Sequence, residues 1–174
     1  RPIILIRQSG KVRMLYEEII RKFNNVGIKY AIVGGVAVNL HGHVRMTADL
    51  DIVLELEDTN LAKAITTLRE AGFICKIPVD PMGLADSNTR NDWIKNKNMK
   101  ALNFYRDTEE VDLVVDTPVK YEEAQKTVFT VRNINYPVVS KEDLIKMKEA
   151  SNRHHDVDDI KKLKILIDLE QENK

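Results

Sequence analysis

Hydrophobic residues recur along this chain with two spacings, one typical of helices and one typical of strands. From residue 11 to residue 26 they recur every three or four positions, which predicts an amphipathic helix that ends at Gly27. Residues 29–33 and 48–54 are short, mostly apolar runs of the kind that form buried strands. The chain is therefore predicted to begin with a helix and to continue with strands.

The rest of the sequence alternates between the same two patterns. The expected elements are a glycine turn at 34–35, a short helix at 36–40, a helix marked by Leu61 and Leu68 and ended by Gly72, a strand at 73–77, a hairpin with arms at 100–105 and 110–115, strand-like pieces near Phe129 and Tyr136, a helix capped by Ser140, and a last helix at 156–169.

Residues 78–98 fit neither pattern. Two prolines and a glycine interrupt regular structure, and Trp93 lies among polar and basic residues. We expect a long loop with a helical turn near Trp93. Such a loop is either functional or a solvated flap.

The order of these elements predicts an α/β or α+β fold with a C-terminal helical pair. A chain of 174 residues buries about 70% of its unfolded surface, which suits one domain over residues 1–174. We expect its core at residues 27–139 and its C-terminal helices at 140–170. Residues 1–10 fit either an edge strand or a remnant without a structural role.

Charge and composition narrow the classes of partner. The 27 basic and 27 acidic side chains cancel, so the whole chain has no general attraction for nucleic acid or an anionic membrane. A basic segment with Lys95, Lys97 and Lys100 points the other way, toward a phosphate-rich partner. No apolar run reaches the roughly 18 residues that span a bilayer, so we expect a soluble, cytoplasmic protein without membrane contact. The single cysteine, Cys75, fits a reducing compartment and a buried strand thiol.

Two acids follow the glycine turn on one predicted strand. Asp49 and Asp51 are two residues apart, so they share a face while Leu50 and Ile52 point to the core. At about 6.6 Å and an effective dielectric constant near 20, their charges repel by roughly 2 to 3 kcal/mol, which a divalent cation would offset. The acids therefore indicate a metal site, although an ordinary half-exposed strand shows the same alternation.

A third acid lies on a later apolar strand. Asp112 sits between Val111 and Leu113, so it would share the face of the first two acids if the strands adjoin, with Asp116 as the fallback. The four histidines offer an alternative zinc site, but His41-Gly42-His43 and His154-His155 lack the spacing of common zinc motifs.

The glycine turn, the paired acids and the later acid resemble, in this order, the pattern of the nucleotidyltransferase superfamily that includes DNA polymerase beta. Residues 45–51 resemble the R-x-T-x-D-[IL]-D form of small bacterial and archaeal members, including the abortive-infection toxin branch. Residues 147–160 resemble the M-K-x4-R-x-K-D-x2-D-I helix signature of the family. The resemblance covers about residues 30–163 and implies a mixed sheet with helices packed on one face.

The resemblance also implies roles for individual residues. Three acids would be catalytic and would bind two Mg²⁺ ions, with Mn²⁺ as a substitute: Asp49, Asp51 and Asp112. Six residues would bind the nucleotide: Gly34, Gly35, Arg45, Thr47, Lys148 and Arg153. Whether Asp156 and Asp159 are structural or functional stays open, and Arg153 and Asp156 are expected to pair or to brace the site.

The implied activity is metal-dependent transfer of an NMP from an NTP, with ATP as one candidate, to an unidentified acceptor, with release of pyrophosphate. The acceptor could be a tRNA, a protein or a small molecule. The alternative is a non-catalytic nucleotide-binding or partner-binding component of a toxin–antitoxin-type system, which would have a partner protein. A metal-dependent phosphohydrolase is a third option.

Overall fold

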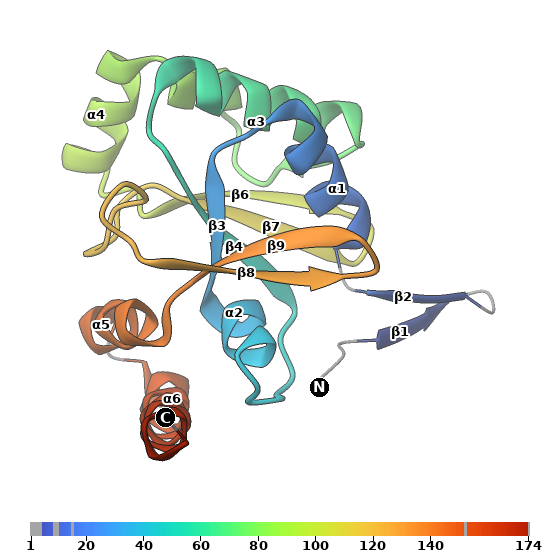
Figure 1. The fold of residues 1–174 in the computed structure, drawn as a ribbon. Coiled ribbons are helices and arrows are strands. Elements are labelled where there is room, and N and C mark those ends of the chain that lie inside the picture. Colours follow the sequence, from blue (N-terminus) through green and yellow to red (C-terminus); the bar gives the residue numbers. More distant parts are fainter. Residues whose placement is uncertain (1–4, 9–10, 15, 152, 174) are drawn as a thin grey trace.

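A mixed seven-stranded sheet forms the centre of the computed structural model, which describes residues 5–8, 11–14, 16–151 and 153–173 (Figure 1). The strands lie in the order β5-β6-β7-β4-β3-β9-β8. The pairs β4–β7 and β3–β9 are parallel, and the other pairs are antiparallel. The bounds are β3 (Tyr30–Val33), β4 (Asp49–Leu54), β5 (Ile74–Cys75), β6 (Ala101–Arg106), β7 (Glu109–Val114), β8 (Lys126–Val131) and β9 (Ile134–Val139).

Helices lie on both sides of the sheet. Figure 1 shows α1, α3 and α4 above it and α2, α5 and α6 below it. Their bounds are α1 (Glu17–Val26), α2 (Gly34–Leu40), α3 (Asp58–Glu70), α4 (Ser87–Lys95), α5 (Lys141–Ser151) and α6 (His154–Glu172), with a short 3-10 helix, η1 (Pro81–Ala85). The predicted mixed α/β fold with a C-terminal helical pair is confirmed. The helices were expected on one face of the sheet, whereas they lie on both sides of it.

The core fills the space between the sheet and the helices above it and extends to α2, α5 and α6 below it. Side chains with the apolar spacing seen in the sequence, such as Phe23 of α1 and Leu61 and Leu68 of α3, are fully buried, as are Ile32 and Ile52 of the central strands. Burial of each such side chain stabilises the fold by about 1.5 to 3 kcal/mol. The core therefore holds β3 and β4 rigidly side by side.

The helix predicted from residue 11 is wrong over its first part. Lys11–Met14 form strand β2, which pairs with β1 (Leu5–Gln8). Helix α1 begins only at Glu17, because Tyr16 has a φ of 62° that a right-handed helix does not allow. The end of the helix at Gly27 is as predicted, with a left-handed φ of 72°.

The long loop predicted at residues 78–98 is wrong, because the segment folds as η1 and α4. The helical turn expected near Trp93 is confirmed, and it extends to the whole of α4. The Asp86 side chain accepts a hydrogen bond from the Thr89 backbone N–H at 2.8 Å and so caps α4. Arg90, which is buried, then donates to the Leu84 carbonyl at 2.8 Å and to Asp58 of α3 at 2.9 Å. This long-range anchoring fixes the segment against α3.

Two further boundaries differ from the prediction. Strand β5 covers only two of the residues 73–77, and Cys75 at this sheet edge is half-buried instead of buried. Helix α6 begins two residues earlier than predicted, at His154. Ser140 caps α5 as predicted, since its Oγ accepts from the Asp143 backbone N–H at 3.2 Å.

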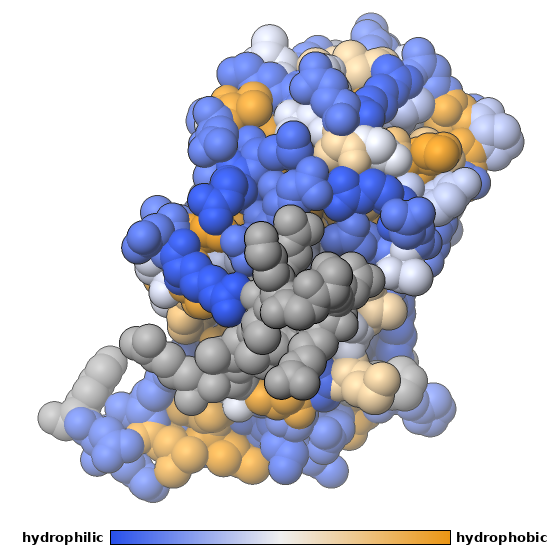
Figure 2. Space-filling model, turned by 90° about the vertical axis from the view of Figure 1, so that its right-hand side faces the viewer, coloured by the Kyte–Doolittle hydropathy of each residue, from blue (hydrophilic) through white to orange (hydrophobic). Residues whose placement is uncertain are grey.

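Large apolar side chains are exposed at several places on the described surface. Figure 2 shows hydrophobic residues gathered along the lower edge of the molecule, where α6 lies. The exposed apolar side chains of this helix are Val157, Ile165 and Leu169. Within the described residues, no helix is long and apolar enough to cross a membrane.

Candidate active site

Asp51 of β4 and Asp112 of β7 face each other directly. They are register partners in the parallel pair of strands, and Asp49 lies two residues before Asp51 on the same face. Leu50 and Ile52 point the other way and are fully buried. The condition set by the sequence, that these strands adjoin, is met, and the structure brings the three predicted acids to one face of the sheet.

The acids lie close together and partly buried, so that ionising them costs free energy. Burial, together with the charges of Asp112 and Asp49, raises the pKa of Asp51 to about 7. Nearby Lys148 and Arg153 oppose this rise only in part. Burial is also the largest cause that raises the pKa of Asp112, and a side-chain hydrogen bond with Asn103 opposes this rise. Asp112 Oδ1 is buried without a hydrogen-bond partner among the described residues. An unpartnered buried carboxylate oxygen is a donor suited to a hard divalent cation.

Gly34 packs directly against one of these acids. Its φ is +65°, and a Cβ at this position would lie 1.9 Å from Asp51 Oδ2. At Gly35, a Cβ would lie 2.4 Å from Thr47 Oγ1 and 2.9 Å from Arg45 Nη2. The turn can therefore approach the acids and the Arg45–Thr47 segment only without side chains, which leaves its backbone beside the site.

A buried ionic network links Arg45 to the C-terminal helices. Arg45 Nε lies 2.8 Å from Asp159 Oδ1, and Arg45 Nη2 donates to Asp159 Oδ2 at 2.9 Å. Lys148 Nζ donates to Asp159 Oδ2 at 2.7 Å and to Asp156 Oδ1 at 3.1 Å. Lys148, Asp156 and Asp159 are all buried. Two of the predicted nucleotide-binding residues thus hold α5 and α6 against the site.

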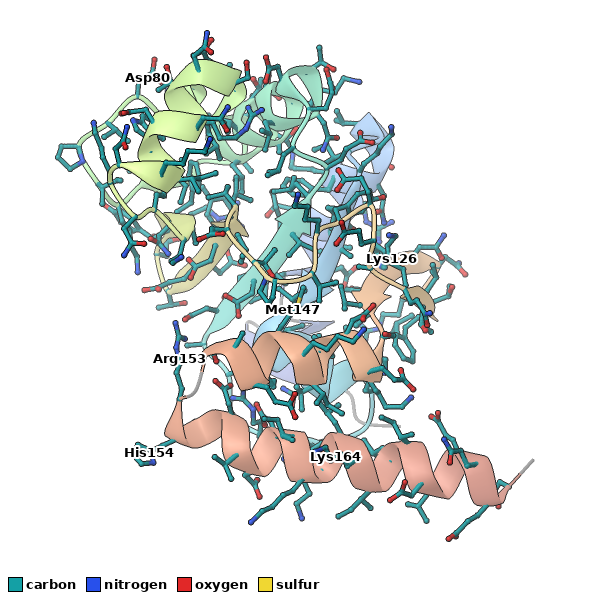
Figure 3. All side chains as sticks on the ribbon, turned by 90° about the vertical axis from the view of Figure 1, so that its left-hand side faces the viewer. Asp80, Lys126, Met147, Arg153, His154 and Lys164 are labelled. Atoms are coloured by element: carbon teal, nitrogen blue, oxygen red, sulfur yellow. The ribbon has the colours of Figure 1, made fainter. Side chains whose placement is uncertain are left out.

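Arg153 lies at the junction of α5 and α6. Figure 3 shows its side chain directed toward the sheet, whereas His154 points away from it. The expected pairing with Asp156 occurs through the backbone, since Asp156 Oδ2 accepts from the Arg153 N–H at 3.3 Å. The exposed Arg153 guanidinium is close enough to lower the pKa of Asp51. Arg153 therefore places a cation near the acids.

Sequence reasoning missed one residue beside the site. The Tyr16 hydroxyl donates to the Ala48 carbonyl and accepts from the Glu110 backbone N–H at 3.2 Å, so it joins the starts of β4 and β7. Burial raises the pKa of Tyr16 to about 12, which keeps it a neutral donor. Its position inside the helix expected at residues 11–26 gave no signal of this role.

The fallback acid and the alternative zinc ligands have other contacts. Asp116 pairs with Lys100. His41 Nε2 lies 2.8 Å from the Val139 carbonyl, and His43 Nε2 lies 3.6 Å from Asp158 Oδ2. Across the described part of the chain, no three His, Cys, Asp or Glu side chains gather into a ready-made metal cluster. The three acids of β4 and β7 thus stand as a shared face and not as a closed ligand cage.

Comparison with known proteins identifies relatives of this arrangement. Residues 10–173 match a family described as a nucleotidyltransferase of unknown function, DUF6036. A search of curated proteins finds no relative.

Several solved structures share the fold. ANT(2″)-Ia in complex with adenylyl-2″-tobramycin matches with a TM-score of 0.54 and 12% identity, over 86% of this chain and 90% of that one. The lincosamide antibiotic adenylyltransferase LnuA, with lincomycin bound, matches with a TM-score of 0.58 and 18% identity, over 85% and 93%. An antigenic nucleotidyltransferase-like protein from Paracoccidioides brasiliensis matches with a TM-score of 0.53 and 18% identity, over 87% and 72%.

Proposed function

Because this chain belongs to the nucleotidyltransferase family DUF6036, we propose that it uses the face formed by Asp49, Asp51 and Asp112 to transfer an NMP from an NTP to an acceptor hydroxyl. The family membership agrees with the resemblance to the superfamily of DNA polymerase beta. The observation that carries the proposal is the pairing of Asp51 with Asp112 directly beside the Gly34 turn.

Divalent ions are general cofactors of nucleotidyltransferases, and the acids suit them. Asp49, Asp51 and Asp112 would hold two Mg²⁺ ions, with Mn²⁺ as a substitute. Support comes from the unpartnered Asp112 Oδ1 and from the raised pKa of Asp51, both of which a bound cation would relieve. When bound, the metal supplies charge neutralisation for the triphosphate and a lower pKa for the attacking hydroxyl.

The side chains and backbone of this chain would position the reactants. The amides of Gly34 and Gly35 would hold the triphosphate, and Arg45 and Thr47 line the turn from the other side. The acceptor oxygen forms a bond to the α-phosphorus while the bond from this phosphorus to the β-phosphate oxygen breaks. The acceptor proton goes to Asp112, and pyrophosphate leaves with the bonding electrons.

Two cations flank this arrangement in different ways. Lys148 is held by Asp156 and Asp159, so its charge acts on the phosphates from within the network. Arg153 is exposed and directed toward the sheet, so it can contact the nucleotide directly (Figure 3). Tobramycin and lincomycin, the small molecules in two of the similar structures, are the first acceptors to try.

Calorimetry tests the donor site without knowledge of the acceptor. ATP, GTP, CTP and UTP would be titrated with Mg²⁺ into the wild type, the Asp49→Ala, Asp51→Ala double variant and Asp112→Asn. We expect metal-dependent binding of at least one NTP by the wild type and its loss in the double variant. Asp116→Asn is the matched control, since Asp116 pairs with Lys100 away from the three acids. Unchanged binding in the double variant would contradict the site.

Product analysis separates the remaining alternatives. A transferase releases pyrophosphate and labels an acceptor, whereas a phosphohydrolase releases phosphate or NMP without an acceptor. A stable complex with a second protein, together with no turnover of any NTP, would favour the non-catalytic toxin–antitoxin component.

A further inference from the structure

Tyr16 has an unusual backbone conformation next to the candidate site. It lies directly before α1 with a φ of 62°, in the left-handed region that residues other than glycine rarely adopt. Its side chain is nonetheless almost completely buried, with 2% of the residue exposed. Strained conformations of this kind persist where the surrounding structure holds them, and they occur often at functional sites. The conformation therefore points to a role for the side chain that it places.

The hydroxyl of Tyr16 joins two strands at the level of one acid. It donates to the carbonyl of Ala48, the residue before Asp49, and accepts from the backbone N–H of Glu110 at 3.2 Å. Glu110 is the register partner of Asp49 in the parallel pair of β4 and β7. The two hydrogen bonds therefore meet the backbone beside Asp49 and fix the start of β4 both to β7 and to the start of α1.

Asp49 is the one of the three acids that stands at the end of the strand pairing. Asp51 and Asp112 pair in the middle of the β4–β7 ladder, with further pairs on both sides, whereas Asp49 takes part in its first pair. Residues 43–48, which precede Asp49, form neither helix nor strand. Because the ends of strands open more readily than their centres, the position of Asp49 depends on contacts outside the ladder.

A phenol suits this bridge, since one hydroxyl donates and accepts at the same time. Burial raises the pKa of Tyr16 to about 12, and the charge of nearby Asp49 adds to this rise. The hydroxyl therefore keeps its proton, and with it the bond to the Ala48 carbonyl, while Asp49 is ionised. Phenylalanine at this position would fill the same space and leave both backbone groups without this partner.

We propose that Tyr16 is a positioning residue for the metal site: its hydroxyl fixes Asp49 relative to Asp51 and Asp112, and so sets the affinity for divalent cations without contacting them. The inference rests on the proposed nucleotidyl transfer. Replacement of residues that orient metal ligands commonly lowers metal affinity about 10-fold to 100-fold. Tyr16 acts through the backbone next to the ligand, so the lower end of this range applies.

Two tyrosine-to-phenylalanine variants separate this role from a merely structural one. Tyr16→Phe removes the bridge and keeps the ring in the core. Tyr30→Phe is the matched control, because Tyr30 is also buried and its hydroxyl donates to Asn24 Oδ1 at 2.8 Å. Tyr30 pairs with Leu54, at the opposite end of β4 from Asp49. Each variant loses the hydrogen bonds of one buried phenol, but only Tyr16→Phe loses them beside the acids.

Calorimetry at increasing Mg²⁺ concentration separates metal affinity from nucleotide affinity. The NTP that binds to the wild type would be titrated into all three proteins at each Mg²⁺ concentration. For Tyr16→Phe we expect the Mg²⁺ concentration that gives half of the maximal NTP affinity to rise about tenfold, with NTP binding restored at saturating Mg²⁺. Tyr30→Phe should require the same Mg²⁺ concentration as the wild type. Both variants should lower Tm by about 2 to 6 °C, so that their stability is matched.

The outcomes distinguish the positioning role from the donor site itself. An unchanged Mg²⁺ requirement in Tyr16→Phe, an equal rise in Tyr30→Phe, or a loss of NTP binding that saturating Mg²⁺ does not restore would overturn the positioning role, while metal-dependent NTP binding by the wild type stands. A wild type that binds no NTP in the presence of Mg²⁺ would overturn the proposed function, and the positioning role with it.

Discussion

Gly34 and Gly27 share a left-handed backbone but differ in their surroundings. Their φ angles are +65° and +72°, whereas a Cβ would meet Asp51 at Gly34 and nothing within 4 Å at Gly27. Alanine at the two positions therefore separates two effects. One is the strain that any side chain causes in this backbone region, and the other is the loss of the space beside Asp51 that the candidate site requires. This makes the two glycines a matched pair for mutagenesis.

Gly34→Ala should lose both stability and nucleotide binding. We expect about 2 to 4 kcal/mol of destabilisation, of which the left-handed backbone accounts for about 1 to 2 kcal/mol and the contact with Asp51 for the rest. Gly27→Ala should cost only the backbone part and bind Mg²⁺–NTP like the wild type. Urea unfolding and calorimetry would measure the two effects. Equal losses in the two variants would show that Asp51 does not crowd the turn.

Asp51 should make the stability of the metal-free protein depend on pH. Its pKa is about 7 in the folded protein and about 4 in the unfolded chain, so the folded state holds the proton more tightly and loses stability as pH rises from 4 to 7. At about 1.4 kcal/mol per pKa unit the full cost would be about 4 kcal/mol, and we expect roughly half of it for a half-buried carboxyl.

Asp51→Asn should therefore be more stable than the wild type at pH 8 without metal, by about 2 kcal/mol, and equally stable at pH 4. Chemical denaturation in the presence of a chelator would measure this difference. Mg²⁺ should stabilise the wild type at pH 8 and leave the variant unchanged. A wild type whose stability rises between pH 4 and 7 relative to the variant would contradict the raised pKa.

At the scale of elements, the candidate active site is divided between the sheet and the C-terminal helices. The two parts are linked by the ion pair of Asp159 on α6 with Arg45, which lies just before β4. Asp159 also pairs with Lys148 of α5. These contacts bring Lys148 and Arg153 near Asp51, as their effect on its pKa shows. The position of α6 is thus a condition for the charge balance of the acids.

Asp159→Ala should destabilise the protein by about 3 kcal/mol, because it leaves buried Lys148 with one carboxylate fewer. Glu149→Ala is the control, since its partner Lys164 is 3.7 Å away at the surface and such pairs contribute less than about 1 kcal/mol. Guanidinium unfolding would compare the two. Similar losses below about 0.5 kcal/mol in both variants would mean that the network does not hold α6 in place.

The same division explains what the sequence could predict. Asp49, Asp51 and the glycine turn were found because their spacing along one strand and one turn is local. The contact between Arg45 and Asp159 joins residues 114 positions apart, and no local pattern in the sequence predicts it. The full length of helix α4 was missed for a related reason, since Arg90 anchors it through a distant contact with Asp58 of α3. The cap at Asp86 is local and could have been recognised in the sequence.

At the scale of the whole molecule, ligand binding should couple to global unfolding. The acids lie on the central strands, so the proposed Mg²⁺–NTP site exists only in the assembled sheet. At a ligand concentration of about 100 times Kd, binding adds roughly 2.7 kcal/mol and raises Tm by about 5 to 10 °C for a protein of this size. Differential scanning fluorimetry would record the shift, which the Asp49→Ala, Asp51→Ala variant should lack. An equal shift in the double variant would place the nucleotide elsewhere.

The parallel pairing of β4 with β7 also governs when activity can arise. Asp51 and Asp112 meet only after α3, η1, α4 and β6 have been made and β7 has inserted between β4 and β6. A chain still emerging from the ribosome carries the first two acids long before it carries the third. The proposed nucleotidyl transfer is therefore withheld from the nascent chain and begins only with the finished sheet.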